Sequence, residues 1–130
     1  MPKDYSKGKI YKIIVETEEE YKPYIGSTCE QSLARRMSKH RTLYNIWEKE
    51  KKNYYSSFEL FIKYGVDKCS IVLVESFSCN NNDELRAKER EWYDKIICCN
   101  KRKPYLKEGE KKQNKKIYDK KYYENKKKLL

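Results

Sequence analysis

The chain has 130 residues, enough for one small domain with a modest hydrophobic core. Its formal net charge is +11, but residues 1–100 carry 18 Lys/Arg against 16 Asp/Glu, whereas residues 101–130 carry 13 against 4. A basic segment on a nearly neutral body favours a polyanionic partner, most often a nucleic acid, although a solvated tail without a partner has the same composition. The longest apolar run, residues 71–74, is too short to cross a bilayer and the first residues form no signal sequence, so we expect an intracellular protein that is neither membrane-bound nor secreted.

Two short strands are predicted near the N-terminus. Residues 9–16 are rich in β-branched and aromatic side chains, and their alternation puts Tyr11, Ile13 and Val15 on one face. Residues 24–26 follow a proline, which is tolerated at the first position of a strand. We expect the two strands to form an antiparallel hairpin.

A long helix is predicted from residue 33 to about residue 51, with Ser32 as its N-cap. Its apolar residues recur at steps of three and four, which places them in one stripe that should pack against the sheet. The stripe consists of Leu33, Met37, His40, Tyr44 and Trp47. Arg36 lies along the edge of this stripe, so a guanidinium and the single imidazole share the buried side of the helix.

A shorter helix is predicted over residues 58–64, capped by Ser56 or Ser57 and ended by Gly65. Residues 69–75 are the clearest strand of the chain. Their apolar character on both faces indicates a central or fully covered position in the sheet.

A third helix is predicted from a cap at Asn82 or Asp83 to near Cys98. Its apolar stripe is Leu85, Glu89, Trp92 and Ile96. A carboxylate in such a stripe must be paired, protonated or metal-bound, because an isolated buried charge is costly. Two interpretations remain open for Glu89: an ion pair with Arg36 that joins two helices, or a ligand to a hard divalent cation.

The five cysteines are an odd number, contain no CxxC pair and are accompanied by one histidine only, so no zinc site of the usual spacing can be assembled. We expect no zinc, and thiols that stay reduced in a cytosol-like compartment. The cysteines are Cys29, Cys69, Cys79, Cys98 and Cys99.

Taken together, these positions resemble the GIY-YIG nuclease domain over most of residues 8–100. The likeness is carried by Lys9-Ile10-Tyr11, then Tyr24-Ile25-Gly26, then Arg36 and His40 in one helix and Glu89 in another. Lys9 departs from the glycine of the family name. The resemblance implies an α+β fold with a small three-stranded antiparallel sheet flanked by helices, and hydrolysis of DNA phosphodiester bonds with one Mg²⁺ or Mn²⁺.

The resemblance also implies roles for individual residues. Glu89 would bind the metal, Arg36 would clamp the scissile phosphate, and Tyr11 would orient or deprotonate the attacking water. Tyr24 and His40 would assist by hydrogen bonding, and Asn100 would support the site from behind. A non-catalytic nucleic-acid-binding module on the same fold is the alternative function.

We expect the nuclease domain to span residues 1–103 and a basic tail rich in lysine and tyrosine to span residues 104–130. The tail would add phosphate contacts and base stacking without sequence choice. The expected partner is DNA, most simply duplex DNA. The basic residues expected to contact it from the domain and its exit are Lys9, Lys12, Arg35, Lys39, Lys101, Arg102 and Lys103.

Overall fold

The computed structural model describes residues 3–106 as a three-stranded antiparallel sheet with helices on both faces. The strand β1 (Lys9–Val15) lies between β2 (Tyr24–Thr28) and β3 (Cys69–Ser76) and pairs antiparallel with both. The β1–β2 hairpin predicted from the sequence is therefore confirmed. Short 3₁₀ helices precede β1 (Tyr5–Lys7) and β3 (Val66–Lys68).

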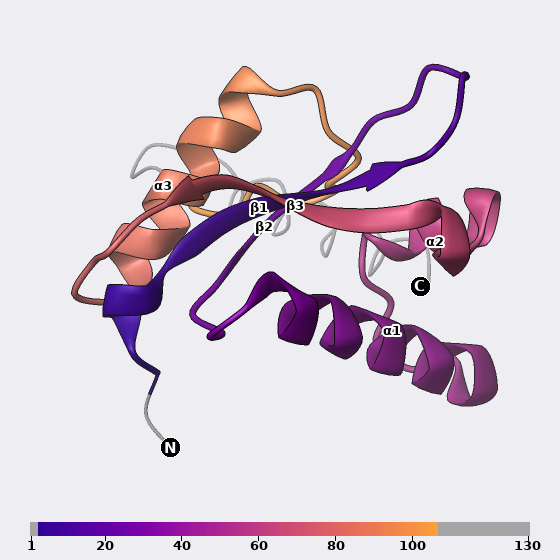
Figure 1. The fold of residues 1–130 in the computed structure, drawn as a ribbon, viewed down its shortest axis with the longest axis horizontal. Coiled ribbons are helices and arrows are strands. Elements are labelled where there is room, and N and C mark those ends of the chain that lie inside the picture. The colour runs from indigo at the N-terminus through magenta and orange to yellow at the C-terminus, as the bar shows by residue number, and fades with distance from the viewer. Residues whose placement is uncertain (1–2, 107–130) are drawn as a thin grey trace, which may run out of the picture.

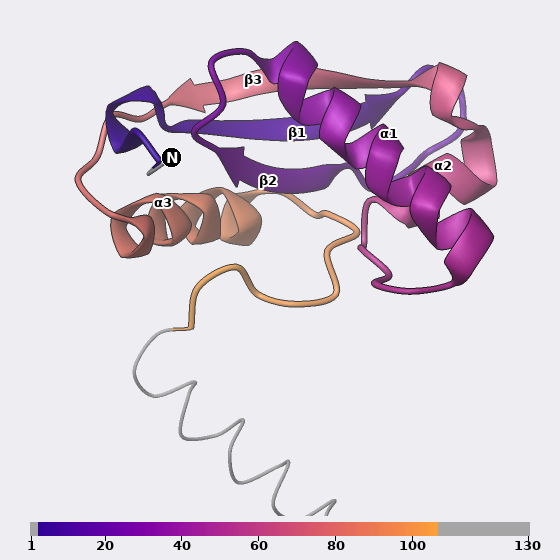
Figure 2. The same cartoon turned by 90° about the horizontal axis from the view of Figure 1, so that it is seen from below.

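Within residues 3–106, three α-helices cover the sheet. Figure 1 shows α1 (Leu33–Glu50) and α3 (Asn82–Lys95) on opposite faces, and Figure 2 shows α1 running across the sheet beside α2 (Phe58–Tyr64). The coarse prediction of a mixed α+β fold with helices around a three-stranded antiparallel sheet is confirmed.

The alternation of β1 divides the core into two parts. Tyr11, Ile13 and Val15 pack with the apolar sides of α1 and α2, as the alternation predicted. Ile10 on the other face packs with Ile25 of β2 and Leu85 of α3. The predicted stripe of α1 also faces the core, because its members are buried or pack against the buried cluster.

The ends of α1 and α2 follow from local chemistry. The Ser32 hydroxyl accepts a hydrogen bond from the Arg35 amide, which confirms the predicted N-cap. Gly65 ends α2 with a φ of 88°, a value that favours glycine. Ser57 occupies the N-cap position of α2 but makes no capping hydrogen bond there, because its hydroxyl contacts His40 instead.

Two predicted features of the third helix were wrong by a few residues. Its cap is Asn81, whose side chain accepts from the Glu84 amide, rather than Asn82 or Asp83. The helix ends at Lys95 and not near Cys98. The chain becomes extended at residue 96, and the Cys99 amide donates to the Pro23 carbonyl, so the segment after α3 follows the sheet instead of continuing the helix.

The predicted central position of the strand over residues 69–75 was also wrong. β3 is an edge strand, and Leu73 in it is half exposed. The apolar residues of β3 are only partly covered by the helices on the two faces, and β1 occupies the centre although it contains Lys12. Apolar character alone did not distinguish a strand covered on both sides from one that lies at the edge.

The packed body extends past the expected boundary at residue 103. Pro104 is buried and its carbonyl accepts from Arg86, while the Tyr105 carbonyl accepts from Arg90. Both arginines belong to α3, so residues 104 and 105 lie against that helix. The rest of the expected basic tail, residues 107–130, lies outside the described residues.

Gly26 should tolerate no side chain, because it pairs directly with Tyr11 and a Cβ would overlap the end of the Tyr11 ring. That ring is fully buried and cannot move aside freely. Gly26→Ala should lower the free energy of unfolding by about 1–3 kcal/mol, as overpacking does. Urea denaturation measures this, and Ser70→Ala at an exposed position of β3 is the control, expected within about 0.5 kcal/mol of wild type. Equal stability of the two variants would contradict the close packing of Tyr11 on Gly26.

Candidate functional site

A polar cleft of about 480 Å³ is lined by β2, α1 and α3. The connection from α1 to α2 and the segment after α3 complete its walls. It brings together residues that are far apart in the sequence. Four of the six positions predicted as catalytic or supporting line it: Tyr24, Arg36, Glu89 and Asn100. The remaining lining residues are Ser27, Tyr54, Tyr55, Ser56, Arg86, Lys101, Arg102 and Pro104.

Tyr11 and His40 lie directly behind this cleft in a hydrogen-bonded chain. The Tyr11 hydroxyl accepts from Arg36 Nε at 3.0 Å and lies 2.7 Å from His40 Nε2. His40 Nδ1 lies 3.1 Å from the Ser57 hydroxyl. The chain therefore connects β1, α1 and the start of α2 and satisfies each buried polar atom in it.

Burial determines the protonation of this chain. Burial raises the pKa of Tyr11 to about 12 although the Arg36 guanidinium opposes the rise. Burial and the charge of Arg36 lower the pKa of His40 to about 3. At neutral pH the chain consists of a phenol, a neutral imidazole and a charged guanidinium, so His40 acts here as a hydrogen-bonding group and not as a cationic acid.

Arg36 presents its charge to the cleft while Tyr11 holds its Nε. Burial by itself would lower the pKa of Arg36, but Tyr11, Tyr24 and Glu89 raise it, so the guanidinium stays charged. A planar guanidinium held from one side can still offer two further nitrogens to an anion, which suits a phosphate.

Among residues 3–106, Glu89 is the only acidic residue that lines the cleft. Its Oε1 accepts from the Ser27 hydroxyl at 2.5 Å, and within residues 3–106 it makes no ion pair with Arg36. The interpretation of Glu89 as a direct ion-pair partner of Arg36 was therefore wrong. Burial raises the pKa of Glu89, and Ser27, Arg86 and Arg36 reduce the rise.

The second oxygen of Glu89 is the feature that points to a cation. Within the described part of the chain Oε2 has no hydrogen-bond donor, and no buried side-chain oxygen lacks a partner, so solvent must reach Oε2 from the cleft. Residues 3–106 contain no group of three His, Cys, Asp or Glu side chains around one point. Glu89 would thus be the single carboxylate ligand, which fits a hard cation that keeps water and phosphate oxygens as its other ligands.

Asn100 completes the edge of the sheet beside the cleft. Its side chain accepts from the Ile25 amide at 2.9 Å and donates to the Ile25 carbonyl at 2.7 Å. Since β2 is an edge strand, Asn100 satisfies backbone groups that have no neighbouring strand. It thereby fixes the backbone on either side of Ile25, where Tyr24 and Gly26 lie.

The two tyrosines differ in their access to the cleft. Tyr24 lines it and packs its ring on Tyr11 and His40, with centroid distances of 6.3 and 5.5 Å. Tyr11 is 0% exposed and does not line it. Burial raises the pKa of Tyr24 as well, and the neighbouring Tyr11 and Glu89 add to the rise.

The predicted nucleic-acid contacts are spread over several places. Lys101 and Arg102 line the cleft and Lys103 does not, while Arg35 and Lys39 line an adjoining groove. Lys9 Nζ donates to the carbonyls of residues 7 and 30, and Lys12 lies on the face of β1 opposite Tyr11. The cation beside the Tyr11 hydroxyl is Arg36.

Sequence reasoning missed Arg86 and Ser27. Arg86 lies one turn before Glu89 on the same side of α3, and its Nε donates to the Pro104 carbonyl at 2.8 Å. The three-residue spacing from Glu89 was a signal that could have indicated it. Ser27 contributes through the pairing of β1 with β2 and its contact with α3, which no local pattern reveals.

Comparisons with protein-family models, with curated proteins and with solved structures gave no match. Across residues 3–106, no helix has both the length and the apolar character needed to span a membrane. All five cysteine thiols, each within those residues, are free.

His40 should make folding stability depend on pH in a defined window. The unfolded chain protonates this histidine near pH 6.5, whereas the folded protein does so near pH 3, so stability should fall as the pH drops from 6.5 toward 3. The maximum slope is about 1.4 kcal/mol per pH unit. His40→Gln retains a side-chain amide beside Tyr11 but does not titrate, and it should lose this slope. Because the chain has one histidine, urea unfolding of both proteins from pH 8 to 4 isolates the effect, and parallel curves would contradict a buried neutral His40.

Proposed function

We propose that the protein is a metal-dependent endonuclease of the GIY-YIG type that hydrolyses phosphodiester bonds of DNA. The observation that carries this proposal is the convergence of Arg36 and Glu89 on one cleft, with Tyr24 beside them and the Tyr11–His40 chain behind. These residues come from four separate elements, and each has the type that the family resemblance requires. The sheet order and the helices on both faces are compatible with the fold of that family.

The charges of the cleft suit phosphodiester hydrolysis. Negative charge develops on the non-bridging oxygens and on the leaving oxygen of the phosphate in the transition state. Arg36 binds those non-bridging oxygens, and its orientation is preset by the bond to Tyr11. Glu89 would hold Mg²⁺ or Mn²⁺, which supplies Lewis-acid stabilisation of the phosphate and lowers the pKa of bound water. Because a proton competes with the cation for Glu89, activity should weaken at acid pH.

The positions of Tyr11 and Tyr24 favour roles for the two residues that differ from the expected ones. The sequence resemblance assigned activation of the water to Tyr11, but its hydroxyl is buried and occupied by Arg36 and His40. Tyr24 reaches the cleft. We therefore assign the contact with the attacking water to Tyr24 and the orientation of Arg36 to Tyr11. Since burial raises both pKa values, each acts as a hydrogen-bonding phenol at neutral pH.

The alternative is a nucleic-acid-binding module on the same fold that does not cleave. The two functions are separated by incubating the protein with supercoiled plasmid and Mg²⁺ or Mn²⁺, with and without chelator. Nicking that depends on the metal supports the nuclease, whereas binding without nicking supports the module.

Glu89→Gln should abolish cleavage and leave DNA binding and folding intact. The amide oxygen of glutamine can still accept from Ser27, and removal of a buried charge that lacks an ion-pair partner should not lower the free energy of unfolding. The measurements are plasmid nicking, DNA binding in chelator and urea unfolding. Glu91→Gln is the matched control, because Glu91 lies on the same helix, is 56% exposed and pairs with Lys88. Full activity of Glu89→Gln would exclude Glu89 as the metal ligand.

Tyr24→Phe should lower the single-turnover cleavage rate by about ten- to a hundredfold, because it removes one hydrogen bond that positions the attacking water. Tyr11→Phe should lower the rate less, since Arg36 loses one hydrogen bond but keeps its charge. Both rates are measured from pH 6 to 9 at saturating Mg²⁺. A larger loss in Tyr11→Phe would return water activation to Tyr11, and losses below tenfold in both would leave activation to the metal alone.

A further inference from the structure

A second groove of about 650 Å³ continues from the cleft along the start of α1. The two share Ser27, Arg36 and Arg86, so the groove adjoins the cleft. The second groove is strongly basic, and its charged lining residues are Lys3, Lys7, Arg35, Lys39, Asp4 and Glu30 beside the two shared arginines. A nucleic-acid strand whose scissile phosphate lies against Arg36 would place neighbouring phosphates in this groove.

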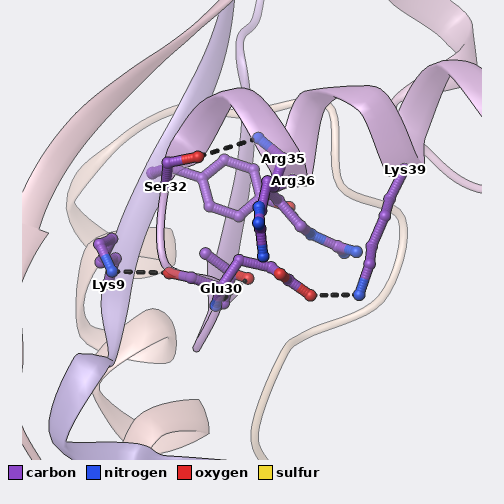
Figure 3. Close-up of polar contacts among 8 residues, drawn as sticks. Lys9, Glu30, Ser32, Arg35, Arg36 and Lys39 are labelled. Carbon is purple, nitrogen blue, oxygen red and sulfur yellow. Dashed lines mark hydrogen bonds and ion pairs between the residues drawn. The ribbon is translucent and has the colours of Figure 1, made fainter.

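Glu30 already places an anion in that groove. Its carboxylate is paired with Lys39, and the hydrogen bond from Lys39, followed by the charges of Lys39, Arg35 and Arg36, lowers the pKa of the carboxyl. Figure 3 shows these four residues together beside the first turns of α1. The Lys9 ammonium donates to the Glu30 carbonyl at 2.7 Å and the Thr28 hydroxyl accepts from the Glu30 amide, so the backbone of Glu30 is held in place.

Basic side chains line this groove beside the start of α1. One amide there, that of Arg35, already donates to the Ser32 hydroxyl. Lys39 is 57% exposed and Glu30 24% exposed, so their pair lies at the surface and can be opened by a competing anion.

We propose that the groove formed by Arg35, Lys39 and Arg36 binds the backbone phosphate next to the scissile one, and that Glu30 occupies this position until nucleic acid displaces it. The identity of the phosphate rests on the proposed nuclease function. The Glu30 carboxylate swings away from Lys39, and a non-bridging phosphate oxygen replaces it. Glu30 therefore weakens the binding of nucleic acid in this groove by the free energy needed to open its pair with Lys39.

The test measures binding of a fluorescein-labelled mixed-sequence 20-base-pair duplex in chelator, so it is independent of cleavage. Glu30→Gln should bind about two- to fivefold more tightly than wild type, the range expected for releasing one exposed ion pair. Glu19→Gln makes the same charge change in the exposed β1–β2 connection, at the opposite end of the hairpin, and should have the wild-type affinity. Circular dichroism verifies that each variant is folded.

A double-mutant cycle with Lys39 makes the mechanism falsifiable. Lys39→Gln should weaken binding and reduce the log–log salt slope by about 0.9, the value for one phosphate contact on duplex DNA. In the Lys39→Gln background, Glu30→Gln should tighten binding less than in wild type, because its pair with Lys39 is absent and only the charges of Arg35 and Arg36 still hold it. A Glu30→Gln effect no larger than that of Glu19→Gln, or one that is undiminished without Lys39, would overturn the proposal.

The source of the phosphate is tested in the same assay. Inorganic phosphate at 5 mM, with ionic strength matched by NaCl, should compete no better than the salt alone if the groove binds a nucleic-acid backbone. Selective competition that disappears in Lys39→Gln would identify a site for small anions instead. If the wild-type protein does not nick plasmid but the binding results are as expected, the proposed nuclease activity is refuted and the proposed phosphate site in the groove stands.

Discussion

The burial of the Tyr11 hydroxyl is the constraint on which the rest of the site depends. A hydroxyl with no access to solvent needs partners, and Arg36 and His40 provide them from successive turns of α1. Those bonds in turn set the rotation of α1 on the sheet and aim the Arg36 guanidinium at the cleft. His40, which is also buried, needs a partner for its second ring nitrogen, and Ser57 provides it. This hydrogen bond joins the start of α2 to α1.

The residues around Tyr11 both pack against its ring and keep its hydroxyl in place for hydrogen bonding. Gly26 leaves the space above β2 that the ring fills, and Tyr24 packs against both Tyr11 and His40. Asn100 closes the open edge of β2 through the backbone of Ile25. The cleft is therefore preorganised before any ligand enters, which is the condition under which charged groups stabilise a transition state well.

On the opposite wall of the cleft, the charged groups are not all paired with one another. Glu89 is held by a neutral hydroxyl and lies near two arginines without pairing with Arg36, so a cation and a phosphate can still enter between them. In the adjoining groove the acidic group is instead tied to Lys39. One carboxylate thus keeps an oxygen open to solvent while the other neutralises a basic surface until a stronger anion arrives.

Local patterns in the sequence determined the strands, the three helices, the stripe of α1 and its Ser32 cap, because periodicity and capping act over a few residues. The stripes also singled out Arg36, His40 and Glu89, whereas the resemblance to a known family supplied the other candidate site residues. Tertiary structure decided what each polar group contacts. Ser27, and not Arg36, became the partner of Glu89, Asn100 became an edge cap of β2, and Arg86 entered the cleft. It also placed β3 at the edge and drew residues 104 and 105 onto α3. These outcomes depend on contacts between residues up to 75 positions apart, which composition and spacing along one chain do not encode locally.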